Sequence, residues 1–273
     1  MMNSYVTEEL RLLISWCIEL HVTNRLQILH RFLSIVTPST LGEPMSNRIV
    51  VITGAKGGLG SFVTRRFLAN NDTVIGASRS IRESDFVSDR FVAIPTDFSD
   101  SSSVQNLAGQ VISRFGRIDV LVHVVGGFAG GAPLHETEEK SWSQMLDQNL
   151  SGAFHVVRAV IPHMRKSGSG RFIAVGSQAA ERPHANLGAY VISKSALVVL
   201  VKTVALENAD RGINANIVLP GTMDTPANRA AMPNADFKKW VPPADVAEVI
   251  LWLAGDSAAQ VNAAAVPVSG REL

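Results

Sequence analysis

Short runs of β-branched and aliphatic residues alternate with longer amphipathic stretches from residue 48 to the C-terminus. Short apolar runs favour buried strands, whereas apolar positions three or four residues apart favour helices. The pattern predicts strands at 48–53, 72–77, 90–95, 118–125, 171–175, 213–219 and 264–268. It predicts helices at 58–70, 102–115, 140–165, 187–208 and 244–254. Strands separated by helices indicate a three-layer α/β fold, a doubly wound parallel sheet of Rossmann type with right-handed crossovers.

Residues 1–46 form an extension before the first predicted strand and follow a different, leucine-rich pattern. Charged residues interrupt every window of the ~20 apolar residues that a membrane span needs. Glu8 stands where a secretory signal would be basic. The extension is interpreted as a helical arm, as a poorly ordered appendage, or as an upstream stretch before a start at Met45. In each case residues 47–273 form a single catalytic domain.

The composition narrows the function classes. Charged residues make up 18% of the chain, below the roughly 25% of an ordinary domain, which favours a sheet covered on both faces. The net charge is +1, so no basic surplus points to a nucleic-acid partner. A single cysteine, Cys17, excludes an intrachain disulfide, and the histidines lack metal-ligand spacing, so no metal is expected. These features predict a cytoplasmic protein with no membrane partner.

The first predicted strand leads directly into a glycine-rich loop at 54–60, GAKGGLG. Gly54 allows the chain to turn sharply, Gly58 lets a pyrophosphate approach the backbone, and Gly60 lets the next helix pack closely on the sheet. The free N–H groups of that helix attract phosphate, and Leu59 is expected to contact the same ligand. A glycine-rich turn also occurs as a plain connection, but its place at the first strand–helix junction favours a dinucleotide cofactor.

The second predicted strand ends at Ser78 and Arg79. An acidic residue here would suit a free ribose 2′-hydroxyl, whereas arginine suits a 2′-phosphate, to which Lys56 adds a second positive charge. The alternative is that Arg79 is a solvated surface charge. NADP(H) is therefore favoured over NAD(H). Asp97 and Phe98 follow the third strand and are expected beside the adenine.

Four residues form a candidate proton-transfer group. Tyr190 and Lys194 are four residues apart on one predicted helix and share a face, and the ammonium is expected to lower the phenol pKa. Ser177 follows a strand, at the edge of the sheet where such folds bind ligands, and Asn149 lies in the long helical stretch. The alternative is an ordinary helix pair, but the chain has only two tyrosines.

The glycine loop, Asn149, Ser177, Tyr190 and Lys194 together resemble the short-chain dehydrogenase/reductase family, in its compact form that includes 3-oxoacyl-ACP reductase-like members. The resemblance runs from the first strand to the C-terminus. It implies that Tyr190 is the general acid–base residue and that Ser177 orients the substrate. It also implies that Lys194 holds the nicotinamide ribose and that Asn149 supports a water-linked proton relay.

The resemblance extends to the segment 220–225, PGTMDT. In the family this segment lies against the nicotinamide, which implies cofactor contacts from Pro220, Gly221, Met223 and Thr225. The C-terminal helix and strand resemble the region through which family members assemble, which implies a homodimer or homotetramer.

One stretch departs from the family pattern. Where the family usually has Asn-Asn-Ala-Gly after the fourth strand, this chain has HVVG at 123–126. Gly126 keeps room for the cofactor. The strand-tying role of the first asparagine falls to His123 or is lost, and a structural histidine is favoured over a catalytic base.

The expected function is interconversion of a carbonyl and an alcohol, in the direction of NADPH-dependent ketone reduction of a small molecule. A dinucleotide-sensing binding protein without turnover is the alternative. A sugar-nucleotide epimerase needs a larger region than the roughly 50 residues after Gly221. The substrate pocket is expected at 127–134, 178–187 and 223–240, with apolar walls from Phe128, Met232, Phe237 and Trp240. Arg182 meets an anionic group there or is solvated.

Overall fold

The structure is a computed structural model, and it describes residues 48–271. The extension 1–46, with its three interpretations, lies outside the described residues. The described chain forms a seven-stranded sheet, all parallel, in the order β3-β2-β1-β4-β5-β6-β7. The strands are β1 (Ile49–Thr53), β2 (Thr73–Ser78), β3 (Phe91–Pro95), β4 (Val120–His123), β5 (Gly170–Val175), β6 (Ile213–Pro220) and β7 (Ala265–Val268).

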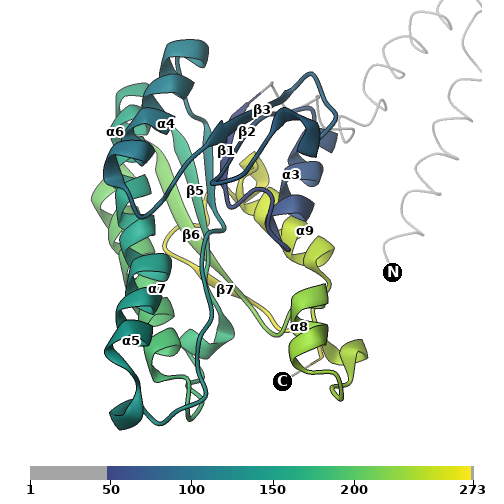
Figure 1. Cartoon of the computed structure of the whole chain (residues 1–273). Coiled ribbons are helices and arrows are strands. Elements are labelled where there is room, and N and C mark those ends of the chain that lie inside the picture. The colour runs from purple at the N-terminus through teal and green to yellow at the C-terminus, as the bar shows by residue number, and fades with distance from the viewer. Residues whose placement is uncertain (1–47, 272–273) are drawn as a thin grey trace, which may run out of the picture. The chain divides into compact units, whose positions relative to one another are not determined.

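Helices cover both faces of the sheet, as the predicted Rossmann fold requires (Figure 1). One layer consists of α4 (Ser101–Phe115), α5 (Glu139–Leu146), α6 (Gly152–Ser167) and α7 (Gly188–Asn208). The other layer contains α3 (Gly60–Ala69) and α9 (Pro243–Leu253), which pack against each other. The strands alternate accordingly: Val51 points into the core under α4 and α6, and Val50 and Ile52 into the core under α3 and α9. The doubly wound prediction is confirmed.

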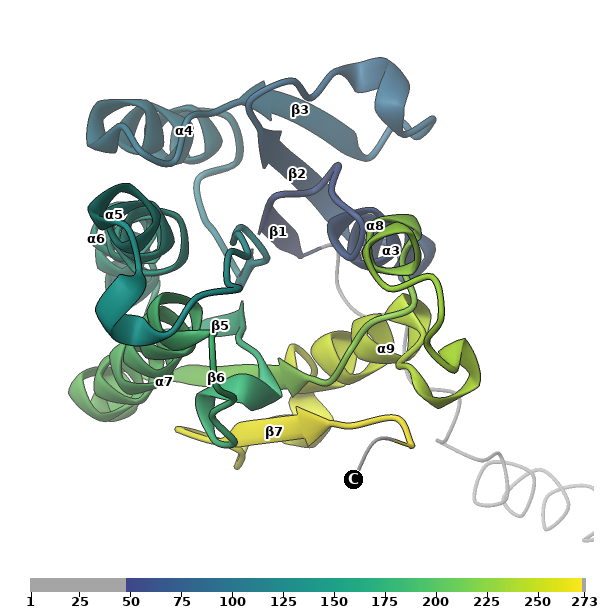
Figure 2. The ribbon, with the colours of Figure 1, turned by 60° about the horizontal axis from the view of Figure 1, so that its bottom comes forward.

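The order in which the chain adds strands to the sheet reverses between β1 and β4. The chain first moves outward from β1 to β2 and β3, and then returns to place β4 on the other side of β1. Thr53, the last residue of β1, is thus in register with Ala77 on one side and His123 on the other. The loops after β1 and β4 diverge at this point, and doubly wound folds bind their ligands in the crevice so formed. Figure 2 shows the strands and the loops that follow them after the molecule of Figure 1 is turned by 60°.

The predicted helix at 140–165 is interrupted. Helix α5 ends at Leu146, a π-helical turn occupies Asp147–Ser151, and α6 begins at Gly152. A π turn inserts an extra residue into the helix and rotates the faces on either side of it. The insertion leaves Asn149 fully buried. Periodicity could not reveal it, because the hydrophobic pattern continues across the turn.

Helix α8 (Pro226–Ala231) was not predicted from the pattern. It has no buried residue, so it carries no apolar periodicity. Its signals are local: the hydroxyl of Thr225 accepts a hydrogen bond from the Asn228 amide at 3.2 Å, and Pro226 occupies the first turn. Residues of this short helix line one side of the crevice.

Helix α7 is the longest helix of the described part of the chain. Together with the residues that follow it, Gly188–Arg211, it is long and apolar enough to cross a membrane by length and composition only. Its apolar side chains are used inside the molecule, since Leu197, Val201 and Ala205 are fully buried in the core under the sheet. A helix buried in a protein core therefore meets the same criteria of length and composition as a membrane span.

Candidate active site

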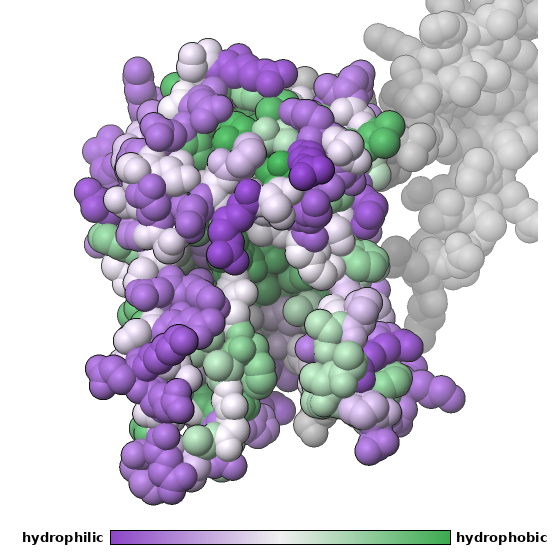
Figure 3. Space-filling view, in the orientation of Figure 1, coloured by the Kyte–Doolittle hydropathy of each residue, from purple (hydrophilic) through white to green (hydrophobic). Residues whose placement is uncertain are grey.

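A cleft of about 2080 Å³ runs across the carboxyl ends of the strands. Figure 3 shows it as a hollow between the two lower lobes of the molecule, with apolar residues exposed inside it. Its wall takes in the glycine loop, the ends of β2 to β6, the π turn and α8. Every residue predicted for catalysis or cofactor binding, except the buried Asn149, belongs to the lining. The structure thus brings these residues together at the carboxyl ends of the strands.

The glycine loop is shaped by two close backbone approaches. Gly54 adopts φ 68°, in the left-handed region that favours glycine, and its N–H donates to the Ala77 carbonyl at 2.7 Å. A Cβ on Gly60 would lie 2.0 Å from the Gly54 carbonyl oxygen, so no side chain fits there. The exposed backbone of Gly57 and Gly58 faces the cleft just before α3 begins. This open backbone at a helix N-terminus fits the pyrophosphate of a dinucleotide.

Two positive charges stand beside the end of β2. Arg79 is exposed and lines the cleft. Lys56 also lines it, and its ammonium forms a 2.9 Å ion pair with Asp85 and a 3.4 Å hydrogen bond to the Ser80 carbonyl. The hydroxyl of Ser78 accepts a 3.5 Å hydrogen bond from the Lys56 amide. The loop and the strand end are thus joined where a ribose 2′-phosphate would lie.

Asp97 and Phe98 follow β3 and line the same end of the cleft. Hydrogen bonds from the Ser99 side chain (2.7 Å) and backbone (3.0 Å) hold the pKa of Asp97 below its ordinary value. Arg79 contributes a smaller electrostatic lowering. Phe98 is almost buried, and its carbonyl accepts a hydrogen bond from His155 Nδ1 at 3.0 Å. An ionised carboxylate is therefore available as an acceptor at this end.

Tyr190 and Ser177 meet in the middle of the cleft. Burial raises the pKa of Tyr190, and a hydrogen bond with Ser177 opposes the rise. The Ser177 hydroxyl also caps the short 3₁₀ turn Gln178–Ala180, accepting from the Ala179 amide at 3.2 Å. The two hydroxyl groups come from different elements, α7 and the end of β5, so their approach depends on the tertiary fold.

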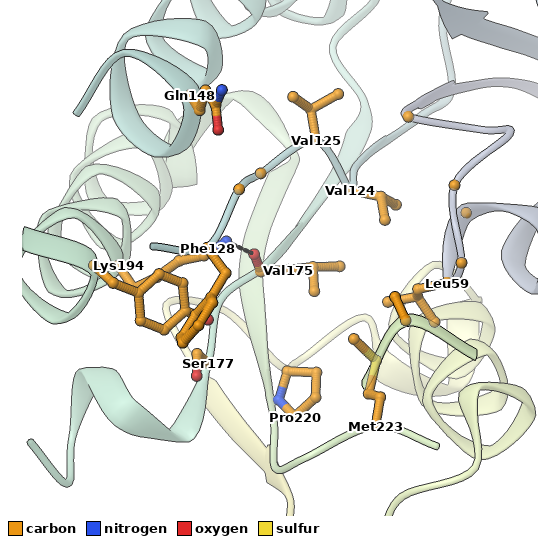
Figure 4. A pocket seen from close by; sticks show the side chains of 18 of the residues that line it. Leu59, Val124, Val125, Phe128, Gln148, Val175, Ser177, Lys194, Pro220 and Met223 are labelled. Atoms are coloured by element: carbon orange, nitrogen blue, oxygen red, sulfur yellow. Dashed lines mark hydrogen bonds between the residues drawn. The ribbon is translucent and has the colours of Figure 1, made fainter. Parts of the chain in front are cut away.

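Lys194 lies one turn after Tyr190 on α7 and is only 5% exposed. Its ammonium donates a hydrogen bond to the Val175 carbonyl at 3.1 Å (Figure 4). Burial lowers the pKa of Lys194 to about 8. The pKa of Tyr190 is raised in this structure and not lowered as the sequence predicted, because burial of the phenol outweighs the hydrogen bond with Ser177.

Asn149 ties the loop after β4 to α7. Its Oδ1 accepts from the Gly127 amide at 2.9 Å, and its Nδ2 donates to the Gly127 carbonyl at 3.1 Å and to Ser193 Oγ at 2.9 Å. Ser193 Oγ in turn donates to the Tyr190 carbonyl at 2.7 Å. A Cβ on Gly126 would lie 2.8 Å from both Asn149 Oδ1 and Lys194 Nζ. Glycine at 126 therefore gives these two polar groups their space.

The segment after β6 closes the other side of the cleft. Pro220, Gly221, Met223 and Thr225 all line it. The Asn228 side chain donates to the Met223 carbonyl at 2.8 Å, which fixes the segment to α8. A Cβ on Gly58 would lie 3.5 Å from the Thr225 methyl, so this segment stands directly beside the glycine loop.

Known proteins share this arrangement. The sequence matches the short chain dehydrogenase family model over residues 48–236. A cis-4-hydroxycyclohexanecarboxylate dehydrogenase of Sinomonas cyclohexanicum is 32% identical over 245 residues, 84% of this chain and 98% of its own. A 2-(R)-hydroxypropyl-CoM dehydrogenase of Xanthobacter autotrophicus is 30% identical over 244 residues, 82% of this chain and 98% of its own. The chain belongs to the short-chain dehydrogenase family.

Solved structures of related proteins agree with this family assignment. A 3-ketoacyl-(acyl-carrier-protein) reductase from Brucella melitensis, complexed with NADH, superposes with a TM-score of 0.75 at 25% identity, over 83% of this chain and 98% of its own. ElxO with NADP bound superposes with a TM-score of 0.77 at 25% identity, over 82% and 98%. This short-chain dehydrogenase is thus an oxidoreductase of alcohol and carbonyl groups that uses a nicotinamide dinucleotide.

His123 takes the structural role in this short-chain dehydrogenase. Its Nδ1 lies 3.0 Å from Thr53 Oγ1, which itself accepts from the backbone amides of Val124 (3.1 Å) and Val125 (3.4 Å). The Thr53 proton therefore points to His123 Nδ1, and β1 and β4 are tied together through the two side chains. The ring is fully buried and does not line the cleft, which disfavours the catalytic-base alternative.

The lining includes residues that the sequence did not predict, and it lacks some that were expected. Of the expected stretch 127–134, only Gly127 and Phe128 line the cleft. Lys140, Ser143, Gln144, Asp147 and Gln148 contribute to the wall. These residues lie on α5 and in the π turn, and the spacing of apolar residues did not predict their position in the wall. Phe237 and Trp240 were expected at the pocket but pack on each other, with ring centroids 4.8 Å apart, outside the lining.

The buried His123 should make the protein acid-sensitive. Burial, and secondarily the charge of Lys194, lower its pKa from 6.5 to about 3. A folded-state pKa below the unfolded value contributes stability that is present above pH 6.5 and is lost as the pH falls toward 3. We expect the free energy of unfolding to fall by about 2 kcal/mol more in the wild type than in His123→Asn between about pH 7 and about pH 5.

Urea denaturation of both proteins at the two pH values measures this difference. His123→Asn is the matched control because asparagine is uncharged over the whole range. Equal losses in the two proteins would show that His123 does not titrate as its burial requires.

Proposed function

We propose that this short-chain dehydrogenase reduces a ketone with NADPH, with Tyr190 as the proton donor. The observation that carries the proposal is the meeting of the Tyr190 and Ser177 hydroxyl groups in a cleft that begins at the glycine loop. The raised pKa of Tyr190 keeps the phenol protonated at neutral pH, which suits a donor in the reductive direction.

A nicotinamide dinucleotide bound in the cleft would supply the hydride for the carbonyl carbon. The residues of this chain then act on the carbonyl oxygen. Ser177 and Tyr190 hydrogen-bond that oxygen and orient it, and Tyr190 gives it a proton. Lys194, with a pKa of about 8, is mostly ammonium at neutral pH and stabilises the phenolate that remains. In the reverse direction the phenolate takes the proton from the alcohol.

Asn149 and Lys194 are proposed to support the catalytic cycle next to Tyr190. Both groups lie within 2.8 Å of the space above Gly126, so they share one small polar region. We infer that this region returns a proton to Tyr190 through water after each turnover, and that Lys194 also holds the nicotinamide ribose. A protein that only senses a dinucleotide has no use for such a polar connection, which disfavours the binding-only alternative.

NADP(H) is the proposed cofactor. The glycine loop, Leu59, Asp97, Phe98, Gly126 and the segment 220–225 are the proposed contacts of the parts that NADP(H) and NAD(H) share. Arg79 and Lys56 are the proposed contacts of the 2′-phosphate, because both line the cleft beside Ser78. The Asp85 ion pair holds the Lys56 ammonium next to Ser80 without burying it.

Replacing Tyr190 by Phe should remove the proton donor while leaving the cofactor site intact. General acid catalysis typically contributes 10²–10⁴-fold, so we expect kcat for ketone reduction to fall by about that factor. NADPH binding, measured by fluorescence titration, should stay within about twofold of the wild type. Turnover at the parent rate in this variant would refute the mechanism, and NADPH binding without turnover in the wild type would favour the sensor.

Replacing Arg79 by Gln should change the cofactor preference. A charge-assisted hydrogen bond to phosphate is worth about 1.5–3 kcal/mol, so KM for NADPH should rise roughly 10- to 100-fold. KM for NADH should change little. Arg211→Gln, a surface arginine remote from the lining, is the matched control. An equal rise for both cofactors, or a wild type that prefers NADH, would contradict the assignment.

We also propose that the enzyme acts in the cytoplasm as a homodimer or homotetramer. Val199 and Leu206 are exposed on α7 and lie two turns apart on one face, and Phe154 is exposed on the neighbouring α6. Trp252 is exposed on the C-terminal helix α9. Static light scattering should give two or four times the 29.3 kDa chain mass. A monomeric mass at micromolar concentration would contradict the assembly.

A further inference from the structure

Phe128 is a large apolar side chain that remains 67% exposed beside the catalytic residues. It lines the cleft, and its ring centroid lies 5.0 Å from that of Tyr190 with the ring planes at 69°. Aromatic pairs favour this edge-to-face arrangement. In Figure 4, Phe128 is grouped with Ser177 and Lys194 at one end of the pocket, away from Leu59 and Met223.

The backbone on either side holds Phe128 in place. Asn149 binds both the amide and the carbonyl of Gly127, immediately before it. On the other side, the Gly131 amide donates to the Asn186 carbonyl at 2.8 Å. Only three residues, 128–130, form the arch between these two attachments. The ring is therefore presented to the cleft from a short arch fixed at both ends.

We propose that Phe128 determines which ketones this enzyme accepts, by forming the wall against which the group next to the substrate carbonyl packs. The assignment rests on the proposed ketone reduction. It favours carbonyl compounds that carry an aryl or other flat unsaturated group over those that carry short alkyl groups.

The reason is the surface that Phe128 exposes. A flat substrate group laid on the ring removes apolar area of both partners from water and adds an aromatic contact. A short alkyl group leaves much of the ring in contact with water. Leu187 and Met232 are further apolar residues of the cleft lining.

Phe128 also limits the access of water to Tyr190. The groups that bear directly on the tyrosine are Ser177, by a hydrogen bond, and Lys194, one turn along α7. The other charged or titratable groups of the cleft near this end come from α5, the π turn and the loop after Ser177, namely Lys140, Asp147, Arg182 and His184. A substitution at Phe128 changes none of these, so a changed Tyr190 titration would report water access alone.

The decisive experiment compares a matched pair of substrates, acetophenone and 2-butanone, with NADPH. In Phe128→Ala the ratio of kcat/KM for the aryl ketone to that for the alkyl ketone should fall about tenfold, the size of one aromatic contact. Phe128→Leu, which keeps apolar bulk without the ring, should give an intermediate ratio. Phe154→Ala, the same truncation outside the cleft, should keep the wild-type ratio.

An unchanged ratio in Phe128→Ala, or an equal fall in Phe154→Ala, would overturn the role of Phe128 while leaving ketone reduction intact. A wild type that binds NADPH but reduces neither ketone would instead overturn the proposed function. The two failures are therefore distinguishable.

A second measurement needs no turnover. The chain has only two tyrosines, Tyr5 and Tyr190, so subtracting the tyrosinate absorbance of Tyr190→Phe from that of each protein isolates Tyr190. Phe128→Ala should lower the pKa of Tyr190, since burial raises it, and Phe128→Leu should lower it less. Circular dichroism confirms that each protein stays folded during the titration. An unshifted Tyr190 pKa in Phe128→Ala would overturn the shielding.

Discussion

Burial of the Lys194 ammonium at the ends of the central strands constrains the groups around it. A buried cation needs acceptors, and the Val175 carbonyl supplies one at 3.1 Å. The same charge helps to keep the neighbouring His123 neutral. A Cβ on residue 126 would lie 2.8 Å from the ammonium, so glycine there gives Lys194 its space. One positive charge on α7 thus bears both on the protonation of His123 and on the space beside Gly126.

The strand order explains why these groups meet. The strand order reverses between β1 and β4, and this reversal opens a crevice at the carboxyl ends of the two strands. Helix α7 brings Tyr190 and Lys194 to that crevice from one face, and the glycine loop approaches from the other side. The π turn brings in Asn149, whose amide links the loop after β4 to Ser193 and so to the Tyr190 carbonyl. The backbone of the proposed proton donor Tyr190 and the backbone of the loop after β4 are therefore linked through Asn149 and Ser193.

The sequence predicts the parts of this site that depend on local pattern. Strand β1 and the loop 54–60 are recognisable because burial and close backbone approach demand particular residue types. The i and i+4 spacing of Tyr190 and Lys194 indicates a shared helix face. What the lysine does there was not predictable, because its acceptor, Val175, comes from a strand distant in the sequence. The partner of His123 and the π turn at Asn149 also depend on distant contacts, and α8 has no buried residue to mark it.

The parts of the site that the sequence predicts also differ in their proposed function from the parts that it does not. The residues proposed for proton transfer and cofactor binding lie on strand ends, on a core helix and at a glycine turn, where burial and backbone geometry restrict the choice. The walls that meet the substrate are the arch 128–130, the loop after Ser177 and α8, which are largely exposed. Exposed segments lose little stability when their side chains change. The type of reaction can therefore be predicted from residues at the strand ends. The proposed selection of the substrate depends instead on side chains such as Phe128, which the core does not constrain.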